Sequence, residues 1–231
     1  MSLIIGLGHK ARQGKNYVAN YMKEYKPEIQ LYAFADELKL YCKAHHDELV
    51  GLWQLANQTK ELPACKNDPI YGYTPILQWY GTNVARESNP NVWVEKLNAK
   101  IEKEKPHIAV VTDVRFQNEA DYIKNAGGFL VDVIRKNADG SQYQDPGRSS
   151  THPSEVALDD YEGWDFIIMC RDGDLKGLRA KAIGVINILT NKYGSYDELI
   201  SMASEVCAMP DATGEPYLDM GGYFEFDNEN S

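Results

Sequence analysis

Short, uninterrupted apolar runs alternate with helical stretches along most of this 231-residue chain. The runs at 108–111 (IAVV) and 166–169 (FIIM) are typical of strands that are buried on both faces, as in parallel sheets. Strands that alternate with helices build α/β folds, in which helices cover both sides of the sheet. We therefore expect a three-layer α/β sandwich with a mainly parallel, five-stranded sheet.

The expected strands are the apolar runs, and the expected helices are the amphipathic stretches between them. Strands are predicted at residues 3–7, 31–34, 108–113, 129–135 and 166–169. Helices are predicted at about 15–25, 36–44, 75–87, 90–105, 118–125 and 175–189. Asn89 is the predicted N-cap of the fourth helix, with Pro90 at its first position. Residues 57–73 are expected to be irregular, and 136–151 to form a polar loop.

Length and composition favour one domain, because a chain with 43% apolar residues can bury one sizeable core. We place this domain at residues 1–195. The remaining residues, 196–231, are expected to form a helix at 196–207 and an acidic tail. For that tail three interpretations stay open: a disordered segment, an edge strand at 223–226, and a contact between subunits.

The net charge of −10 opposes attachment to nucleic acid, since such binding depends on Lys and Arg that neutralise phosphates. An anionic ligand would need a local cluster of basic residues. No apolar run approaches the roughly 20 residues that span a bilayer, and the N-terminus lacks the features of a signal peptide. We expect no membrane partner and a cytoplasmic protein, in the host cytoplasm if the chain is viral. The number of subunits stays open, with a homodimer among the alternatives.

The strongest chemical signal is a turn between the first predicted strand and the first predicted helix. Backbone N–H groups in such a turn, together with the positive end of the helix, form an anion site. Lys15 is expected to reach the β and γ phosphates of ATP, with added charge from Lys10 and Arg12. The turn departs from a Walker A loop by one extra residue, and by Asn16 where a hydroxyl would bind magnesium. An ordinary turn with surface charges is the alternative. The turn reads Gly8-His9-Lys10-Ala11-Arg12-Gln13-Gly14-Lys15.

Asp113 follows the apolar run at 108–111 and is the candidate partner of this loop. In a P-loop protein, a carboxylate at this place holds Mg²⁺ or its waters near the phosphates. The alternatives are a helix N-cap and a solvated strand end.

Four further stretches follow the loop along the chain: FADELK at 34–39, LQWYGT at 77–82, DVRFQNEA at 113–120 and HPSE at 152–155. On these stretches the chain resembles the bacteriophage-type deoxynucleoside monophosphate kinase family, as far as about residue 189. The resemblance implies a P-loop NTPase fold of the nucleoside monophosphate kinase type, with a lid at about 136–151 and an acceptor-binding helical region at about 36–105. It also implies ATP and Mg²⁺ as cofactors and nucleotides as small-molecule partners.

The resemblance implies roles for individual residues as well. ATP would be bound by Gly8, His9, Lys10, Ala11, Arg12, Gln13, Gly14, Lys15 and Asn16, and the metal by Asn16 and Asp113. Catalysis would involve Lys15, Arg12 and Asp113, together with the lid arginines Arg135 and Arg148. The acceptor monophosphate would be bound by Asp36, Lys39, Gln78, Arg86, Arg115, Glu119 and Glu155.

The expected reaction is transfer of the γ-phosphoryl group of ATP to a deoxynucleoside monophosphate. Such a transfer depends mainly on positioning and charge stabilisation, for which arginines and a metal are suited. Two alternatives stay open. One is a P-loop kinase of another acceptor, such as a nucleoside, a small phosphorylated metabolite or a modified base in DNA. The other is a nucleotide-binding protein that has lost catalysis.

Overall fold

The structure is a computed structural model that describes residues 2–59, 74–146 and 150–190. Five strands form one sheet in the order β2-β3-β1-β4-β5, and all neighbouring strands run parallel. The α/β class and the five-stranded parallel sheet are therefore confirmed. The strands are β1 (Leu3–Gly8), β2 (Ile29–Tyr32), β3 (Ile108–Val111), β4 (Phe129–Lys136) and β5 (Phe166–Arg171).

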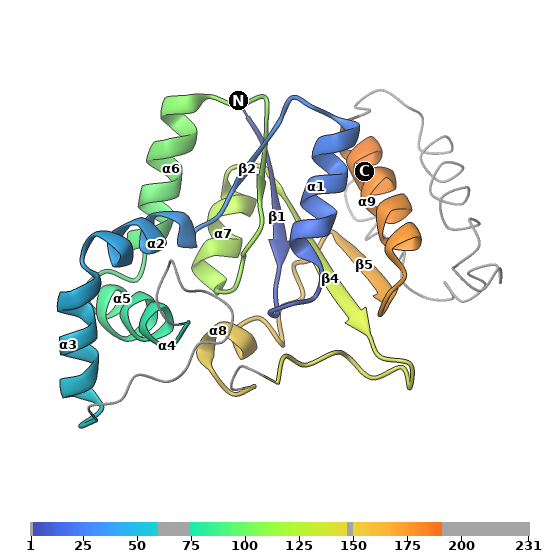
Figure 1. The fold of residues 1–231 in the computed structure, drawn as a ribbon. Coiled ribbons are helices and arrows are strands. Elements are labelled where there is room, and N and C mark those ends of the chain that lie inside the picture. Colours follow the sequence, from blue (N-terminus) through green and yellow to red (C-terminus); the bar gives the residue numbers. More distant parts are fainter. Residues whose placement is uncertain (1, 60–73, 147–149, 191–231) are drawn as a thin grey trace.

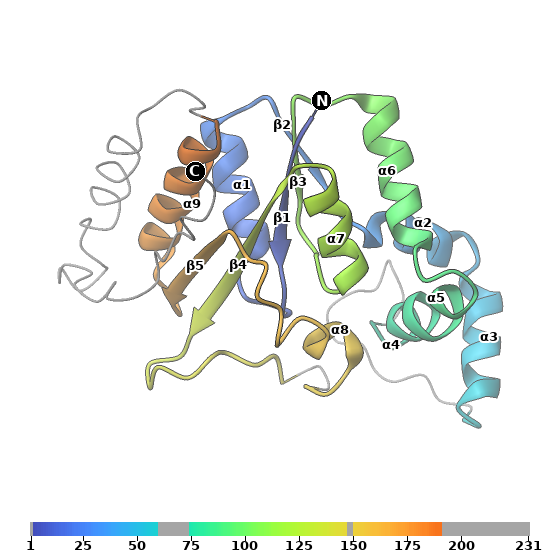
Figure 2. The ribbon, with the colours of Figure 1, turned by 180° about the vertical axis from the view of Figure 1, so that it is seen from behind.

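Helices cover both faces of this sheet (Figures 1 and 2). On one face lie α1 (Lys15–Tyr25) and α9 (Leu175–Thr190), and on the other lie α6 (Val92–Glu104) and α7 (Gln117–Asn125). The apolar side chains of β3 and β4 alternate between two cores, one under each helical layer. Burial of this kind stabilises the fold by roughly 1.5–3 kcal/mol for each fully buried large apolar side chain. The first core includes Ile5, Val18, Val110 and Ile186, and the second includes Ile4, Trp93, Ile123 and Leu130.

A smaller group of helices lies beyond the carboxyl edge of the sheet (Figure 1). Its own core contains Cys42, Leu49 and Ile76. The predicted helix at 75–87 is present, but its middle is a π-helical turn (Trp79–Val84), which separates two short α-helices. The helices of this group are α2 (Ala35–Ala44), α3 (His46–Ala56), α4 (Thr74–Gln78) and α5 (Ala85–Ser88).

Several details of the predicted secondary structure were wrong. The second strand, predicted at 31–34, is formed by Ile29–Tyr32. The fourth predicted helix does not start at Pro90, because α6 begins at Val92 with Asn91 as its N-cap. The side chain of Asn89 instead accepts a hydrogen bond from the backbone N–H of Asn91, which closes the preceding turn. Two helices were also missed, namely α3 and the short α8 (Pro153–Val156). The predictions for 60–73 and 196–231 lie outside the described residues.

The topology determines where a ligand can bind. β1 lies between β3 and β4, so connections from the middle of the sheet leave in opposite directions. A crevice forms at such a switch point, outside the carboxyl ends of the strands. The turn that follows β1, and the segments that follow β3 and β5, all lie at this edge.

No helix in the described part of the chain is long and apolar enough to cross a membrane.

Candidate active site

The turn from His9 to Gly14 joins β1 to α1 and presents the N-terminus of α1 to the crevice. Gly14 is the N-cap residue, and its φ of 104° lies in the left-handed region that glycine adopts without strain. The first N–H groups of a helix have no partner within the helix, and a glycine cap supplies none. These groups are therefore available to an anionic ligand.

Gly8 has a packing role that accounts for the extra residue in the loop motif. It is the last residue of β1 and pairs in register with Asp132 of β4. A Cβ atom at Gly8 would lie 2.1 Å from the ring of Trp164, so no larger residue fits there. The loop proper therefore starts at His9, and Gly8 does not occupy the place of the first Walker glycine.

Lys15 is the first residue of α1, and its side chain is buried in the loop. Its ammonium group donates a hydrogen bond to the backbone carbonyl of Lys10. Burial, followed by repulsion from Arg115, lowers the pKa of Lys15 to about 7, although Asp113 and Glu155 oppose this shift. The lysine thus lies in a dry environment, in which its charge interacts strongly with a phosphate.

His9 and Gln13 anchor the loop to the rest of the fold. The ring nitrogens of His9 lie 3.0 Å from Asp132 and 3.1 Å from Asp159, and the ring stacks on Trp164. The amide of Gln13 donates to the carbonyl of Tyr143 (2.8 Å) and accepts from the backbone N–H of Arg135 (2.8 Å). Both side chains are buried, and their hydrogen bonds fix the loop backbone.

Three other cations around the loop pair with carboxylates from distant segments. Such carboxylates hold the cations in place, and an anionic ligand has to compete with them. Arg135 also stacks on the ring of Tyr143, 3.9 Å from its centre. The pairs are Lys10–Asp159 (2.6 Å), Arg12–Asp145 (2.9 Å) and Arg135–Asp172 (2.6 Å).

Asp113 connects the end of β3 to the start of α2. One carboxylate oxygen accepts the backbone N–H of Phe34 (2.7 Å), and the other accepts that of Ala35 (2.9 Å). Burial raises the pKa of Asp113, while these two N–H groups oppose the shift. Asp113 is not a helix N-cap residue, since Phe34 and Phe116 hold that position in α2 and α7, but its carboxylate holds the backbone at the start of α2.

The opposite end of the crevice is organised by Glu119, which is almost completely buried. One of its oxygens accepts from the guanidinium of Arg86, and the other accepts the backbone N–H groups of Arg115 (2.8 Å) and Phe116 (3.2 Å). Arg86 also lies over the ring of Phe116, 4.1 Å from its centre. Burial raises the pKa of Glu119 to about 7 against the opposing effect of Arg86. Glu119 therefore positions Arg86.

Gln78 has an unsatisfied amide in this end of the crevice. Its Nε2 is buried and has no hydrogen-bond partner among the described residues. A buried donor without an acceptor costs about 1–3 kcal/mol, so a ligand acceptor here would remove a real penalty. Gln78 shares this part of the cavity with Leu38 and Trp93.

One cavity of about 760 Å³ joins the loop to Arg86. It brings together most of the predicted site residues: Arg12, Gln13, Gly14, Lys15, Asn16, Lys39, Gln78, Arg86, Asp113, Arg115, Glu119 and Arg135. Gly8, His9, Lys10, Ala11, Asp36 and Glu155 do not line it. Asp36 instead accepts the backbone N–H of Ala33 (3.1 Å). Arg148 lies outside the described residues.

The cavity also has a lining that sequence reasoning missed. It extends along the turn between β5 and α9, from Cys170 to Leu175, and reaches Leu178. Tyr17, the second residue after Lys15, lines it as well and is 55% exposed. The available signal was the polar run RDGD directly after an apolar strand, because polar residues at the carboxyl ends of parallel strands often bind ligands.

Comparison with known proteins gives two relatives by sequence. A protein of Acanthamoeba polyphaga mimivirus, named "Putative deoxynucleotide monophosphate kinase", is 32% identical over 191 residues, which cover 72% of this chain and 88% of that protein. The "Deoxynucleoside-5'-monophosphate kinase" of Escherichia phage T5 is 32% identical over 98 residues, 40% of this chain and 39% of that protein. A scan against models of protein families finds no match.

Comparison with solved structures finds a sugar kinase from Janibacter sp. HTCC2649. The superposition covers 89% of this chain and 98% of the sugar kinase chain, at 10% sequence identity and a TM-score of 0.39. That likeness is too weak to inform on either fold or function.

A parallel α/β sheet with a turn rich in glycine and basic residues after its central strand is common to phosphotransferases and other nucleotide-binding proteins, and the viral relatives, both named as kinases, identify this chain as a phosphotransferase. The chain belongs to the deoxynucleoside monophosphate kinase family, since it covers most of the length of its mimivirus relative.

Proposed function

We propose that this protein transfers the γ-phosphoryl group of ATP to deoxynucleoside 5′-monophosphates and releases deoxynucleoside diphosphates. The observation that carries the proposal is the single cavity that connects Lys15 with Arg86 and Gln78. Its volume of about 760 Å³ lies within the usual range for small-molecule sites. Two phosphate-binding ends in one cavity suit a reaction between two nucleotides, because both phosphates have to meet in line.

At the donor end, the N-terminus of α1 and Lys15 would bind the β and γ phosphates of ATP. The turn from Cys170 to Leu175 and the exposed ring of Tyr17 would contact the donor nucleoside. Arg12 and Arg135 would exchange their carboxylate partners for phosphate oxygens. Arginine suits this exchange because its planar group holds two oxygens at once.

At the acceptor end, Arg86 and Arg115 would bind the monophosphate. Arg86 is already oriented by Glu119 and by the Phe116 ring, so little side-chain freedom is lost on binding. The buried amide of Gln78 would donate to the base of the acceptor. Lys39 would add a positive charge at the same end.

Magnesium would enter with ATP. No group of three or more His, Cys, Asp or Glu residues in the described part of the chain is arranged to hold a metal. Mg²⁺ in kinase sites needs only one or two carboxylates, because phosphates and waters complete its shell. Asp113 and Asn16 line the cavity beside Lys15 and fit this need. The ion would neutralise charge on the phosphates.

The proposed function is tested by incubation of the protein with ATP, Mg²⁺ and each deoxynucleoside monophosphate in turn. We expect deoxynucleoside diphosphate to form with at least one of them. Parallel reactions with ribonucleotides, with free nucleosides and with DNA identify another acceptor. Diphosphate formation with none of the monophosphates would reject the proposal.

Replacement of Asp113 by Asn should lower kcat by about 10²–10³-fold, an effect comparable to the loss of one strong transition-state contact. Asparagine replaces one of the two carboxylate oxygens with an NH2 group, which cannot accept, so one of the two backbone N–H groups loses its acceptor and the start of α2 should also loosen. We expect a loss of about 1–3 kcal/mol in the free energy of unfolding. The exposed Asp121, changed to Asn, is the control. Steady-state kinetics and thermal unfolding measure the two effects, and unchanged kcat in Asp113→Asn would exclude the role.

The pH dependence of ATP use should follow Lys15. Its pKa of about 7 means that the free protein loses this charge as the pH rises through that value. Since kcat/KM reports the ionisation of the free enzyme, kcat/KM for ATP should fall above about pH 7. The fall in kcat should occur at higher pH, because bound phosphates raise the lysine pKa. A kcat/KM that stays level up to about pH 9 would contradict this prediction.

A further inference from the structure

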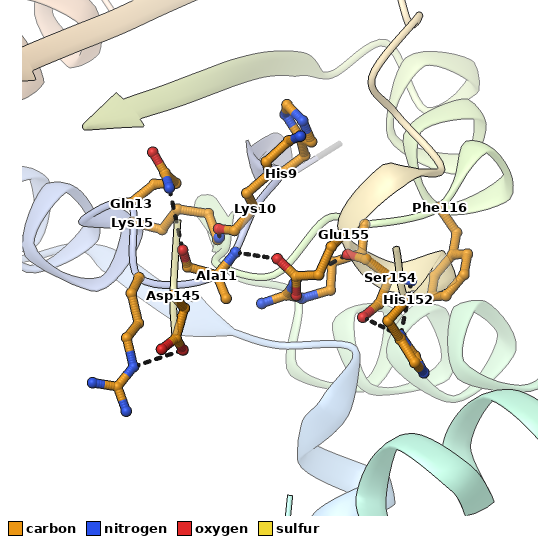
Figure 3. A network of polar contacts seen from close by, with 12 residues as sticks. His9, Lys10, Ala11, Gln13, Lys15, Phe116, Asp145, His152, Ser154 and Glu155 are labelled. Carbon is orange, nitrogen blue, oxygen red and sulfur yellow. Dashed lines mark hydrogen bonds and ion pairs between the residues drawn. The ribbon is translucent and has the colours of Figure 1, made fainter. Parts of the chain in front are cut away.

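Glu155 occupies an unusual place between the two ends of the site. It belongs to α8, is 7% exposed and does not line the cavity. One of its oxygens accepts the backbone N–H of Ala11 in the phosphate loop (2.8 Å). The other accepts from the guanidinium of Arg115 (2.7 Å), which does line the cavity. Figure 3 shows Glu155 directed at the loop backbone.

The segment that carries Glu155 is itself held firmly. His152 caps α8, since its ring nitrogen accepts the backbone N–H of Ser154 (3.2 Å), and Leu158 is buried in the second core. Asp159 binds both Lys10 and His9 of the loop. The carboxylate of Glu155 is therefore fixed relative to the loop and relative to the core.

Arg115 is held by contacts with the same segment. Its guanidinium donates to the backbone carbonyl of Ser154 (3.1 Å) as well as to Glu155. Its backbone N–H is bound by Glu119. A buried, charge-assisted pair of this kind fixes both distance and orientation.

We propose that Glu155 is a positioning residue that sets Arg115 at a fixed distance from the phosphate loop, so that donor and acceptor phosphates meet in line. The inference rests on the proposed kinase function and assigns Glu155 a role away from the substrate. It acts through Arg115 and does not itself contact a nucleotide. Because in-line transfer is sensitive to displacements of about 1 Å, the loss of this link should affect kcat more than the binding of ATP.

The variant Glu155→Gln separates the two contacts of Glu155, the one with the Ala11 N–H and the one with Arg115. The amide oxygen of glutamine can still accept the Ala11 N–H, but its NH2 group is a donor and cannot accept from Arg115. We expect kcat to fall about 10–100-fold. The KM for ATP should change by less than about 3-fold, because the loop backbone keeps its bond to residue 155. Asp160→Asn, an exposed change in the same segment, is the matched control and should leave both values unchanged.

A double-mutant cycle distinguishes positioning from a merely structural role. If Glu155 acts through Arg115, Glu155→Gln should have no further effect on kcat in a protein that already carries Arg115→Met. All reactions are run at one pH and below the unfolding temperature of every variant. Losses that multiply in the double variant, or an unchanged kcat in Glu155→Gln, would overturn the inference. If the inference fails in this way while the Asp160→Asn control still forms diphosphate, the proposed kinase function is retained. If the wild-type protein has no turnover, the proposed function and this inference both fall.

Discussion

Lys15→Ala is expected to lower kcat by about 10²–10³-fold or more, while the protein stays folded. The ammonium group of Lys15 is buried at the N-terminus of α1, where charge on a transferring phosphoryl group is neutralised most effectively. Its removal does not leave a buried charge without a partner. The fold should therefore tolerate the change.

Lys15→Met is the matched variant, because it keeps most of the side-chain volume and removes the ammonium group with its charge and its hydrogen bonds. Both variants are compared with the wild type by steady-state kinetics and thermal unfolding. Equal losses of activity, with unfolding temperatures close to that of the wild type, would show that the charge matters. An active Lys15→Met would count strongly against the role of the loop.

Arg86→Met is expected to have the second largest effect, on stability and on acceptor binding together. It leaves Glu119 buried without its cationic partner, and the loss of one member of such a pair costs about 3–5 kcal/mol. The KM for the acceptor should also rise, since Arg86 lines the acceptor end of the cavity. Chemical denaturation and acceptor kinetics measure the two effects.

The double variant Arg86→Met with Glu119→Gln separates these effects. A glutamine at 119 can still accept the N–H groups of Arg115 and Phe116, but it carries no charge that needs a partner. Most of the stability should return, whereas the acceptor KM should stay high. Recovery of both would show that Arg86 is only structural.

The sheet and the main helices could be predicted because their patterns are local. Strands such as Ile108–Val111 are apolar throughout, and the stripe of Trp93, Leu97 and Ile101 on α6 repeats at helical spacing. The helix α3 was missed although Leu49, Leu52, Trp53 and Ala56 repeat at helical spacing in it. Leu49, Val50 and Trp53 pack against the small third core, whereas Leu52 and Leu55 are exposed.

The candidate site could be predicted as a set of residues but not as an arrangement. The phosphate loop was visible because its glycine and lysine follow one strand and start one helix. Contacts such as Ala11 with Glu155, or His9 with Asp132, join positions more than 100 residues apart and leave no local pattern. For the same reason Glu155 was expected to bind substrate, whereas the structure places it between the loop and Arg115 (Figure 3).

The central claim is that the turn before Lys15 binds the polyphosphate of ATP. The most direct measurement is a crystal structure of the protein with a non-hydrolysable ATP analogue and Mg²⁺. We expect the β and γ phosphates within hydrogen-bonding distance of the N–H groups at the start of α1 and of the Lys15 ammonium, with Asp113 facing the metal. A nucleotide bound elsewhere, with this turn empty and Asp113 facing away, would contradict the account.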